Sequence, residues 1–260
     1  MAPSRSLVTL TTDFGAGSGY SAALKGAVLS VNPAASVLDL SHQLPPQDLS
    51  AAALFLGDVI PHFPAGAIHV VVVDPGVGTE RSLLCVVWRH QAVLAPDNGC
   101  WTSLEAIEPV QAVYRLTESR FWAKSISATF HGRDVLGPAA GHLSLGVPPD
   151  ALGPVVNSWI RLPAPEPLIE TDLAVGQIVH IDPFGNAITN LPAAAVSGLR
   201  RIEAGPHRVD RFVRTYGEAE PGTVVALIGS SGRLEIAVVN GSAAQRLGLQ
   251  VGEPVRVRRN

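Results

Sequence analysis

The stretch Ala67-Ile-His-Val-Val-Val-Val-Asp-Pro-Gly-Val-Gly-Thr-Glu-Arg81 decides how the rest of the chain is interpreted. Its valines, Val70 to Val73, predict a strand buried on both faces, as in the middle of a parallel sheet. Asp74 and Pro75 then end the strand, since proline has no amide hydrogen to donate. A carboxylate at the end of an interior strand lies where open α/β sheets bind their ligands. The stretch therefore predicts both a fold class and a place for a site.

A second charged residue, Arg81, follows in the same loop, before an apolar run from Leu83 to Val87. An aspartate and an arginine this close in sequence can form a structural ion pair or part of a functional site. The position of the loop, between two predicted strands, favours the functional interpretation.

The amino-terminal half alternates predicted strands and helices. Asp48 is placed to cap the second helix, and the order strand–helix–strand–helix–strand is typical of a parallel sheet with right-handed crossovers. The predicted elements are a strand at Leu7–Thr12, a helix at Tyr20–Val31, a strand at Ser36–Leu40, a helix at Leu49–Ile60 and the valine-rich strand. A further strand at Ala92–Pro96 and a helix-like run at Val135–Leu145 follow.

The pattern changes in the last third of the chain. Short predicted strands separated by glycine turns replace the helical periodicity, which suggests a small antiparallel β-barrel or sandwich. These strands are Gly176–Asp182, Thr223–Ile228, Leu234–Val239 and Pro254–Arg258. We predict an α/β domain with a mostly parallel sheet at residues 1–155, a proline-rich linker at 156–172 and a β-barrel domain at 173–260.

Composition excludes several classes of function. The chain has 260 residues and a formal net charge of −3, so it offers no general attraction for nucleic acid. It contains no apolar run of membrane-spanning length and no signal-peptide pattern, which leads us to expect a cytoplasmic protein that binds no membrane. Neither Cys85 nor Cys100 has a partner at metal-ligand spacing, and the histidines show no paired spacing, so we expect no metal.

Three other motifs have both a functional and a structural interpretation. Gly15-Ala-Gly-Ser-Gly19 follows a strand, and Asp39 ends the next one, but the glycine spacing departs from that of a dinucleotide fingerprint. Asp182-Pro-Phe-Gly-Asn186 is either a binding loop or an Asx-rich turn. Gly229-Ser-Ser-Gly232 is most simply a hairpin turn, although its amides could also receive a carboxylate.

Taken together, seven motifs resemble those of the S-adenosylmethionine hydroxide adenosyltransferases, relatives of the fluorinase and chlorinase, in order and spacing over nearly the whole chain. The motifs are Thr11-Thr-Asp-Phe-Gly15, Pro45-Pro-Gln-Asp48, Val73-Asp-Pro-Gly-Val-Gly-Thr79, Ala95-Pro-Asp-Asn-Gly99, Ala128-Thr-Phe-His-Gly-Arg-Asp134, Phe184-Gly-Asn186 and Leu234-Glu-Ile-Ala237. The resemblance implies hydrolysis of S-adenosyl-L-methionine to adenosine and L-methionine, without a cofactor. It also implies a homotrimer with sites at its subunit interfaces.

The resemblance also implies roles for individual residues. The family's Asp–Arg–His set falls on Asp74, Arg81 and His131, and its ribose-binding aspartate on Asp13. The remaining substrate contacts implied by the resemblance are Thr129 beside the nucleophile, Phe184 and Asn186 at the adenine, and Asp182, Ser230 and Ser231 at the methionine. Considered alone, His131 would be an ordinary histidine at the edge of a helix.

Two alternatives remain open beside hydrolysis. The halide-using relatives carry a tyrosine where this chain has Asp74, the fluorinase carries a serine in place of Gly132, and both contain an insertion that this chain lacks near Trp88 to Gln91. These differences favour water over halide as the nucleophile. A protein that binds S-adenosylmethionine or adenosine without catalysis is the other alternative.

Overall fold

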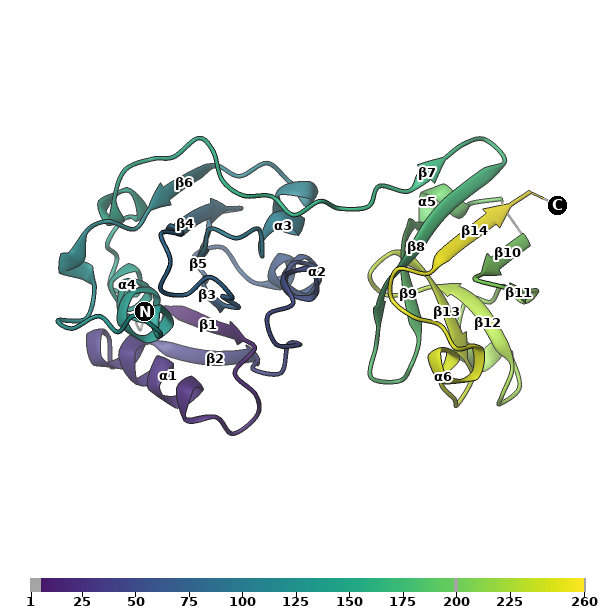
Figure 1. The fold of residues 1–260 in the computed structure, drawn as a ribbon, viewed down its shortest axis with the longest axis horizontal. Helices are drawn as coiled ribbons and strands as arrows, with labels where there is room; N and C mark the ends of the chain where they lie inside the picture. Colours follow the sequence, from purple (N-terminus) through teal and green to yellow (C-terminus); the bar gives the residue numbers. More distant parts are fainter. Residues whose placement is uncertain (1–5, 199–200, 260) are drawn as a thin grey trace, which may run out of the picture. The chain divides into compact units, whose positions relative to one another are not determined.

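The computed structural model describes residues 6–198 and 201–259. They form two compact units, which divide between Leu162 and Pro163. The first unit is an α/β domain with a mostly parallel sheet, as the sequence predicts (Figure 1). The strands of its sheet are β1 (Leu7–Thr12), β2 (Ser36–Ser41), β3 (Ile68–Val72), β4 (Leu83–Trp88), β5 (Gln91–Pro96) and β6 (Ala112–Arg115). Its helices are α1 (Gly19–Val31), α2 (Leu49–Val59), α3 (Thr102–Ile107) and α4 (Gly137–Ser144), with short turns η1 (Ile60–His62), η2 (Ser119–Phe121), η3 (Gly132–Leu136) and η4 (Pro149–Leu152).

The strand order is β2-β1-β3-β5-β4-β6. The β2–β1, β1–β3 and β3–β5 pairs are parallel, whereas β4 is antiparallel to both β5 and β6. The order turns back between β1 and β3, because the chain leaves β1 for β2 on one side and returns to β3 on the other. Open α/β sheets bind ligands at the carboxyl ends of the strands at such a switch point.

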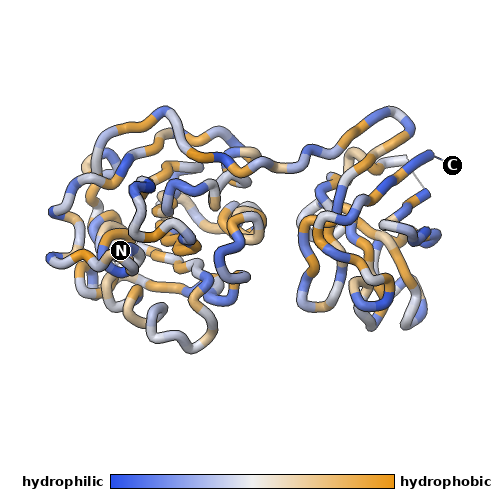
Figure 2. Tube along the Cα trace, in the orientation of Figure 1, coloured by the Kyte–Doolittle hydropathy of each residue, from blue (hydrophilic) through white to orange (hydrophobic). Residues whose placement is uncertain are grey.

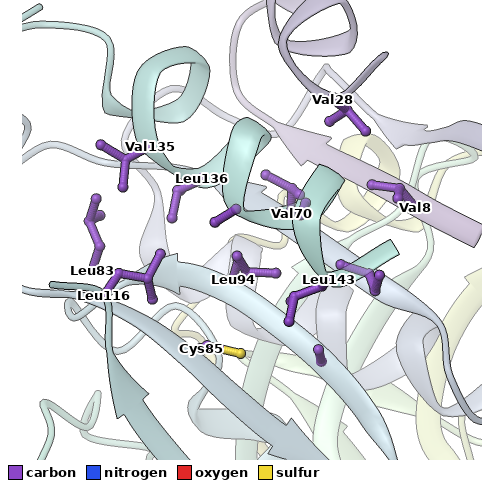
Figure 3. Close-up of a cluster of buried hydrophobic side chains, with 14 of the residues drawn as sticks. Val8, Val28, Val70, Leu83, Cys85, Leu94, Leu116, Val135, Leu136 and Leu143 are labelled. Atoms are coloured by element: carbon purple, nitrogen blue, oxygen red, sulfur yellow. The ribbon is translucent and has the colours of Figure 1, made fainter. Parts of the chain in front are cut away.

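Helices pack on both faces of this sheet. Leu24 and Val28 of α1 share one buried cluster with Val70 of β3 and Ala139 of α4, while α2 and α3 cover the opposite face. Figure 3 shows side chains of the 135–143 helical segment above Val70 and Leu94 of the sheet. All five residues of β3 are buried, which confirms the interior strand predicted from its valines.

The helix ends follow from local chemistry. The Asp48 carboxylate accepts a hydrogen bond from the Ala51 amide, which confirms the predicted cap of α2, and Ser18 caps α1 in the same way. The helix predicted at Val135–Leu145 starts earlier, at Gly132. Its first turn, η3, is a π-helix, a wide turn that is often found at functional sites.

The second unit is an antiparallel, nearly closed barrel, as predicted. Its strand order is β11-β10-β14-β8-β9-β13-β12, with β7 added to β8. A bridge from Phe212, just after β11, to Ala226 of β12 brings the two ends of the sheet together. The strands are β7 (Leu168–Ile169), β8 (Leu173–Ile181), β9 (Ala187–Pro192), β10 (Arg201–Ala204), β11 (His207–Val209), β12 (Val224–Ile228), β13 (Arg233–Val238) and β14 (Pro254–Arg258), accompanied by α5 (Ala193–Val196), η5 (Tyr216–Glu218) and α6 (Ala243–Leu247).

The barrel core is built by alternation along each strand. On β14, Val255 and Val257 are buried, and arginines stand between and after them, as the alternating colours of this strand show in Figure 2. On β13, Leu234, Ile236 and Val238 belong to the core, while Ala237, together with Val239 just after the strand, belongs to a second, smaller cluster with Val213. The outer face of β13 is therefore also covered.

Candidate active site

The carboxyl ends of β1 and β3 bring two of the predicted site residues to the same edge of the sheet. Thr12 and Val72 are paired neighbours on these parallel strands. Asp13 directly follows β1, and Asp74 follows β3 after Val73. Both carboxylates therefore stand at the switch point of the strand order, where a ligand is expected.

Asp74 and Arg81 form a bidentate ion pair. The Arg81 Nε atom lies 2.8 Å from Asp74 Oδ1, and Nη2 lies 2.5 Å from Oδ2. The two side chains are only 7% and 8% exposed, respectively. The structural ion pair that the sequence left open thus exists, and its burial at a strand end distinguishes it from an ordinary surface pair, which contributes little.

His131 completes a continuous set of three side chains. Arg81 Nη2 also lies 2.9 Å from His131 Nδ1. Because a guanidinium only donates hydrogen bonds, Nδ1 is the acceptor and the imidazole is neutral. Burial, and after it the charge of Arg81, lowers the pKa of His131 below 6.5, whereas Asp74 and Asp134 oppose this shift. Arg81 therefore joins the carboxylate to a neutral histidine from 50 residues further along the chain.

The segment that carries His131 is held by two contacts. The buried Asp134 carboxylate accepts the Ser127 amide at 2.8 Å and also pairs with Arg133. On the other side, Gly78 lies so close that a Cβ there would be 2.6 Å from the Ala128 carbonyl oxygen. The 127–131 segment thus packs against the same loop that carries Asp74.

Thr129 lies within this segment. Its hydroxyl is 3.2 Å from the Ser127 hydroxyl, and its side chain belongs to the exposed part of the loop. Thr129 is thus an exposed residue two positions before His131.

Asp13 is held by one of its two oxygens. The Gln47 amide donates to Oδ2 at 2.8 Å, and Gln47 has a left-handed backbone with φ of 63°. No other partner of the Asp13 carboxylate occurs among the described residues, so Oδ1 can accept from a ligand.

Three neighbouring rings, Phe14, Tyr20 and Phe130, contact one another with centroids 5.4–5.8 Å apart.

Asn98 is a residue that the sequence analysis quoted only as part of a motif. Its side-chain amide donates to the Val73 carbonyl at 2.9 Å, directly before Asp74, and its own oxygen accepts the Cys100 amide. Asp97 instead accepts the Ile160 amide at 2.8 Å. This motif therefore supports the end of β3 and does not itself present a reactive group.

The acidic residue of the alternative dinucleotide site is not free to bind a ribose. Asp39 lies 2.5 Å from Lys25 Nζ and 3.0 Å from His42 Nε2, so its carboxylate is already paired on both oxygens. A free carboxylate at this position would be needed to bind a ribose in a dinucleotide fold. The glycine-rich turn at 15–19 is therefore a connection into α1.

In the second unit, Asp182 organises the loop between β8 and β9. Its Oδ1 accepts the amides of Phe184 and Asn186, and its Oδ2 accepts the Asn186 side-chain amide, all at 2.9 Å. The Asx-rich turn that the sequence allowed is thus present. Asn186 is buried, while the Phe184 ring is 78% exposed, which is unusual for a large apolar side chain.

Ser230 and Ser231 occupy the tight turn between β12 and β13. The Gly229 amide donates to the Arg233 carbonyl, and the Gly232 amide donates to the Gly229 carbonyl, which confirms the predicted hairpin turn. Both serines are exposed at its tip. The first unit thus assembles Asp13, Asp74, Arg81, Thr129 and His131, and the second presents its residues on two loops.

Within residues 6–198 and 201–259, no group of three or more histidine, cysteine, aspartate or glutamate side chains is arranged to hold a metal ion. The same residues include no helix that is long and apolar enough to cross a membrane.

Comparison with known proteins decides the family. Residues 8–153 match the model of the SAM hydroxide adenosyltransferase N-terminal domain, and residues 176–256 match that of the C-terminal domain. The chain belongs to this family. The two matches confirm the resemblance identified from the seven motifs.

Individual relatives cover almost the whole chain. The (R)-S-adenosyl-L-methionine hydrolase of Thermus thermophilus is 43% identical and covers 96% of this chain and 98% of its own length. The hydrolase of the same name from Salinispora arenicola is 36% identical, with coverage of 96% and 97%. A crystal structure of an uncharacterised conserved protein from Thermotoga maritima superposes with a TM-score of 0.91 at 29% identity, covering 97% of this chain and all of that one. Fluorinases are more distant, as shown by that of Nocardia brasiliensis at 24% identity.

Proposed function

We propose that this protein hydrolyses S-adenosyl-L-methionine to adenosine and L-methionine. The observation that carries the proposal is the hydrogen-bonded set Asp74–Arg81–His131 at the ligand-binding edge of the sheet. Membership of the family and the names of relatives at 34–43% identity support the same reaction.

The reaction needs a nucleophile more than it needs an acid. The oxygen of water attacks the ribose 5′ carbon, the bond from that carbon to sulfur breaks, and its electron pair stays on sulfur as a neutral thioether. The sulfonium leaves without protonation, whereas water, with a pKa of about 15.7, is a poor nucleophile at pH 7. The protein's task is therefore to stabilise hydroxide character in the transition state.

Arg81 supplies positive charge for that purpose, because an arginine stays protonated and does not act as a base. Asp74 fixes the orientation of the guanidinium through its two oxygens. Either His131 or Asp74 takes the proton of the water. The lowered pKa of His131 keeps its ring neutral at pH 7, but its acceptor nitrogen Nδ1 is bound to Arg81, so His131 takes the proton only by giving up that contact.

The remaining residues hold the substrate. Asp13 accepts the ribose hydroxyl groups through its free oxygen, which fixes the 5′ carbon for in-line attack. Thr129 borders the pocket of the nucleophile. In the second unit, Phe184 and Asn186 contact the adenine, and Asp182, Ser230 and Ser231 serve the methionine end.

The active protein is proposed to be a cytoplasmic homotrimer with its sites at subunit interfaces. Residues 1–155 carry the Asp–Arg–His set and the ribose site, residues 156–172 act as the linker, and residues 173–260 contribute the adenine and methionine contacts. No cofactor or metal takes part. Light scattering of the purified protein measures the mass of the assembly.

Use of halide is the competing reaction, and the 24% identity to a fluorinase is the observation in its favour. Gly132 opposes it, because a Cβ at this position would lie 3.0 Å from both methyl groups of Val72. A serine at this position, as expected in the fluorinase, would require the Val72 side chain to shift by a few tenths of an ångström. Binding without turnover is the other competitor.

One incubation separates these functions. Purified protein, S-adenosylmethionine and ¹⁸O-labelled water should give adenosine with the label at its 5′ oxygen, followed by chromatography and mass spectrometry. A His131→Ala variant is the control and should form at least tenfold less adenosine. Formation of 5′-chloro-5′-deoxyadenosine on addition of chloride would support the halide reaction, and thermal stabilisation without product would support a binding protein.

A further inference from the structure

Glu235 is a buried carboxyl group that the proposed mechanism does not use. It stands on the same face of β13 as Ala237, which is covered by the smaller cluster, and the residue is only 6% exposed. Burial of a carboxyl group costs free energy unless its oxygens are hydrogen-bonded or paired with a positive charge.

One oxygen of Glu235 has a partner and the other does not. The Tyr216 hydroxyl donates to Oε1 at 2.5 Å. For Oε2 the part of the chain that the structure describes provides no donor. This oxygen points toward the Ser230–Ser231 turn, since a Cβ built on Gly229 would lie 2.6 Å from it. Gly229 thus leaves room for the carboxylate directly beneath the turn.

Asp182 lies close enough to interact electrostatically with both Glu235 and Tyr216. Its own oxygens, however, already accept three hydrogen bonds from Phe184 and Asn186 within the loop. Of the two carboxyl groups, only Glu235 presents an oxygen free of protein donors. The pair together forms a region of negative potential beside the turn.

We propose that Glu235 is the residue that recognises the α-ammonium group of the substrate, while Asp182 shapes the adjacent loop and adds to the negative potential. The inference rests on the proposed function, because it assigns one contact of the same substrate. An ammonium ion offers three donors and a positive charge, which is what an unpaired, partly desolvated carboxylate oxygen requires.

The surroundings of Glu235 make this contact dependent on protons. Burial and the charge of Asp182 raise its pKa, and the Tyr216 hydrogen bond opposes that rise. Without ligand, Glu235 therefore takes up a proton more readily than a solvated glutamate, and an arriving ammonium group favours the ionised form. The apparent affinity for an aminated ligand should fall as the pH is lowered toward 5.

Three adenosyl compounds test the assignment by calorimetry on the full chain. S-adenosyl-L-homocysteine carries both the ammonium and the carboxylate, S-adenosyl-3-thiopropylamine carries only the ammonium, and 5′-methylthioadenosine carries neither. In Glu235→Gln, the two aminated compounds should bind about 10- to 100-fold more weakly. Binding of 5′-methylthioadenosine should stay within twofold of the wild-type value.

An Asp182→Ala variant provides the contrast. It removes the acceptor that orders Phe184 and Asn186, so it should weaken all three compounds, including 5′-methylthioadenosine. Gly229→Ala is a second test, because the new methyl group must displace the Glu235 carboxylate, and it should reproduce the selective loss. Equal binding of the aminated compounds by wild type and Glu235→Gln would overturn the assignment, as would failure of the wild type to bind them.

Failure of this assignment and failure of the proposed function look different. Wild-type protein that forms adenosine, together with a Glu235→Gln variant of unchanged KM and affinity, contradicts the role of Glu235 alone. Selective loss of the aminated compounds in a protein that forms no adenosine supports the role of Glu235 and contradicts hydrolysis.

Discussion

Replacement of Gly78 by alanine should separate the geometry of the active site from the general stability of the fold. Gly78 has φ of +81°, and its missing Cβ would lie 2.6 Å from the Ala128 carbonyl oxygen. To reach an ordinary contact of 3.4 Å, the 127–131 segment has to retreat by about 0.8 Å. His131, three residues further on, would move with it and lengthen its 2.9 Å contact with Arg81.

The expected size of the effect follows from that displacement. A misplacement of about 1 Å at a catalytic group costs roughly 100-fold in rate, so kcat of Gly78→Ala should fall about 10- to 100-fold. The left-handed backbone adds about 1–2 kcal/mol of strain for alanine. KM should change less than kcat, because Asp13, the proposed ribose-binding residue, lies on a different loop.

Gly66→Ala is the matched control. Gly66 has nearly the same φ, +83°, but a Cβ there would meet nothing within 4 Å, and the residue lies before β3, at the opposite end of the strand from Asp74. It should lose a similar 1–2 kcal/mol of stability in thermal denaturation while its kcat stays within twofold of wild type. If Gly78→Ala keeps the kcat of Gly66→Ala, the contact with Ala128 does not position His131, and the reasoning fails.

Three further predictions concern the same cluster. First, kcat should fall only below pH 6.5, because burial and Arg81 lower the pKa of His131, and protonation of His131 would break its contact with Arg81. An NMR titration of His131 with a midpoint above 6.5 would contradict this. Arg81→Lys should reduce kcat about 100-fold or more, since a lysine cannot span both Asp74 and His131; steady-state kinetics with full rate for this variant would remove Arg81 from the mechanism. Asp134→Asn weakens the acceptor of the Ser127 amide and should lower the free energy of unfolding by about 1–3 kcal/mol in urea denaturation. Because Asp134 also raises the pKa of His131, the acid limb of the kcat profile should move to lower pH in this variant. An unmoved limb would limit Asp134 to a structural role.

Much of the fold was predictable because it follows local rules. The consecutive valines of β3 carry no polar group, so the strand is buried on both sides. Asp48 precedes a run of helix formers that its carboxylate caps. The antiparallel barrel was visible as strands separated by glycine. β10 and β11 were missed, since they are short and joined by a two-residue turn at Gly205 that leaves little alternation to detect.

The site was predictable only in part, because it depends on contacts between distant segments. Periodicity placed Asp74 at a strand end, but no local pattern links it to His131, and that pairing came from family resemblance. The π-helical turn at Gly132 was not anticipated, since it differs from an α-helix only in which amide donates to the carbonyl: that of Gly137, five residues on. The sequence analysis named Glu235 only as part of a strand and a motif, because its contact with Tyr216 joins segments that no local pattern connects.

The central position of Arg81 has a consequence for how the active site tolerates change. Asp74 and His131 share no hydrogen bond of their own among the described side chains, so the hydrogen-bonded link between them runs through one guanidinium. The effects of removing Asp74, Arg81 and His131 should therefore be strongly non-additive, with the triple variant little worse than Arg81→Ala alone. A change at Arg81 therefore releases both of its partners at once.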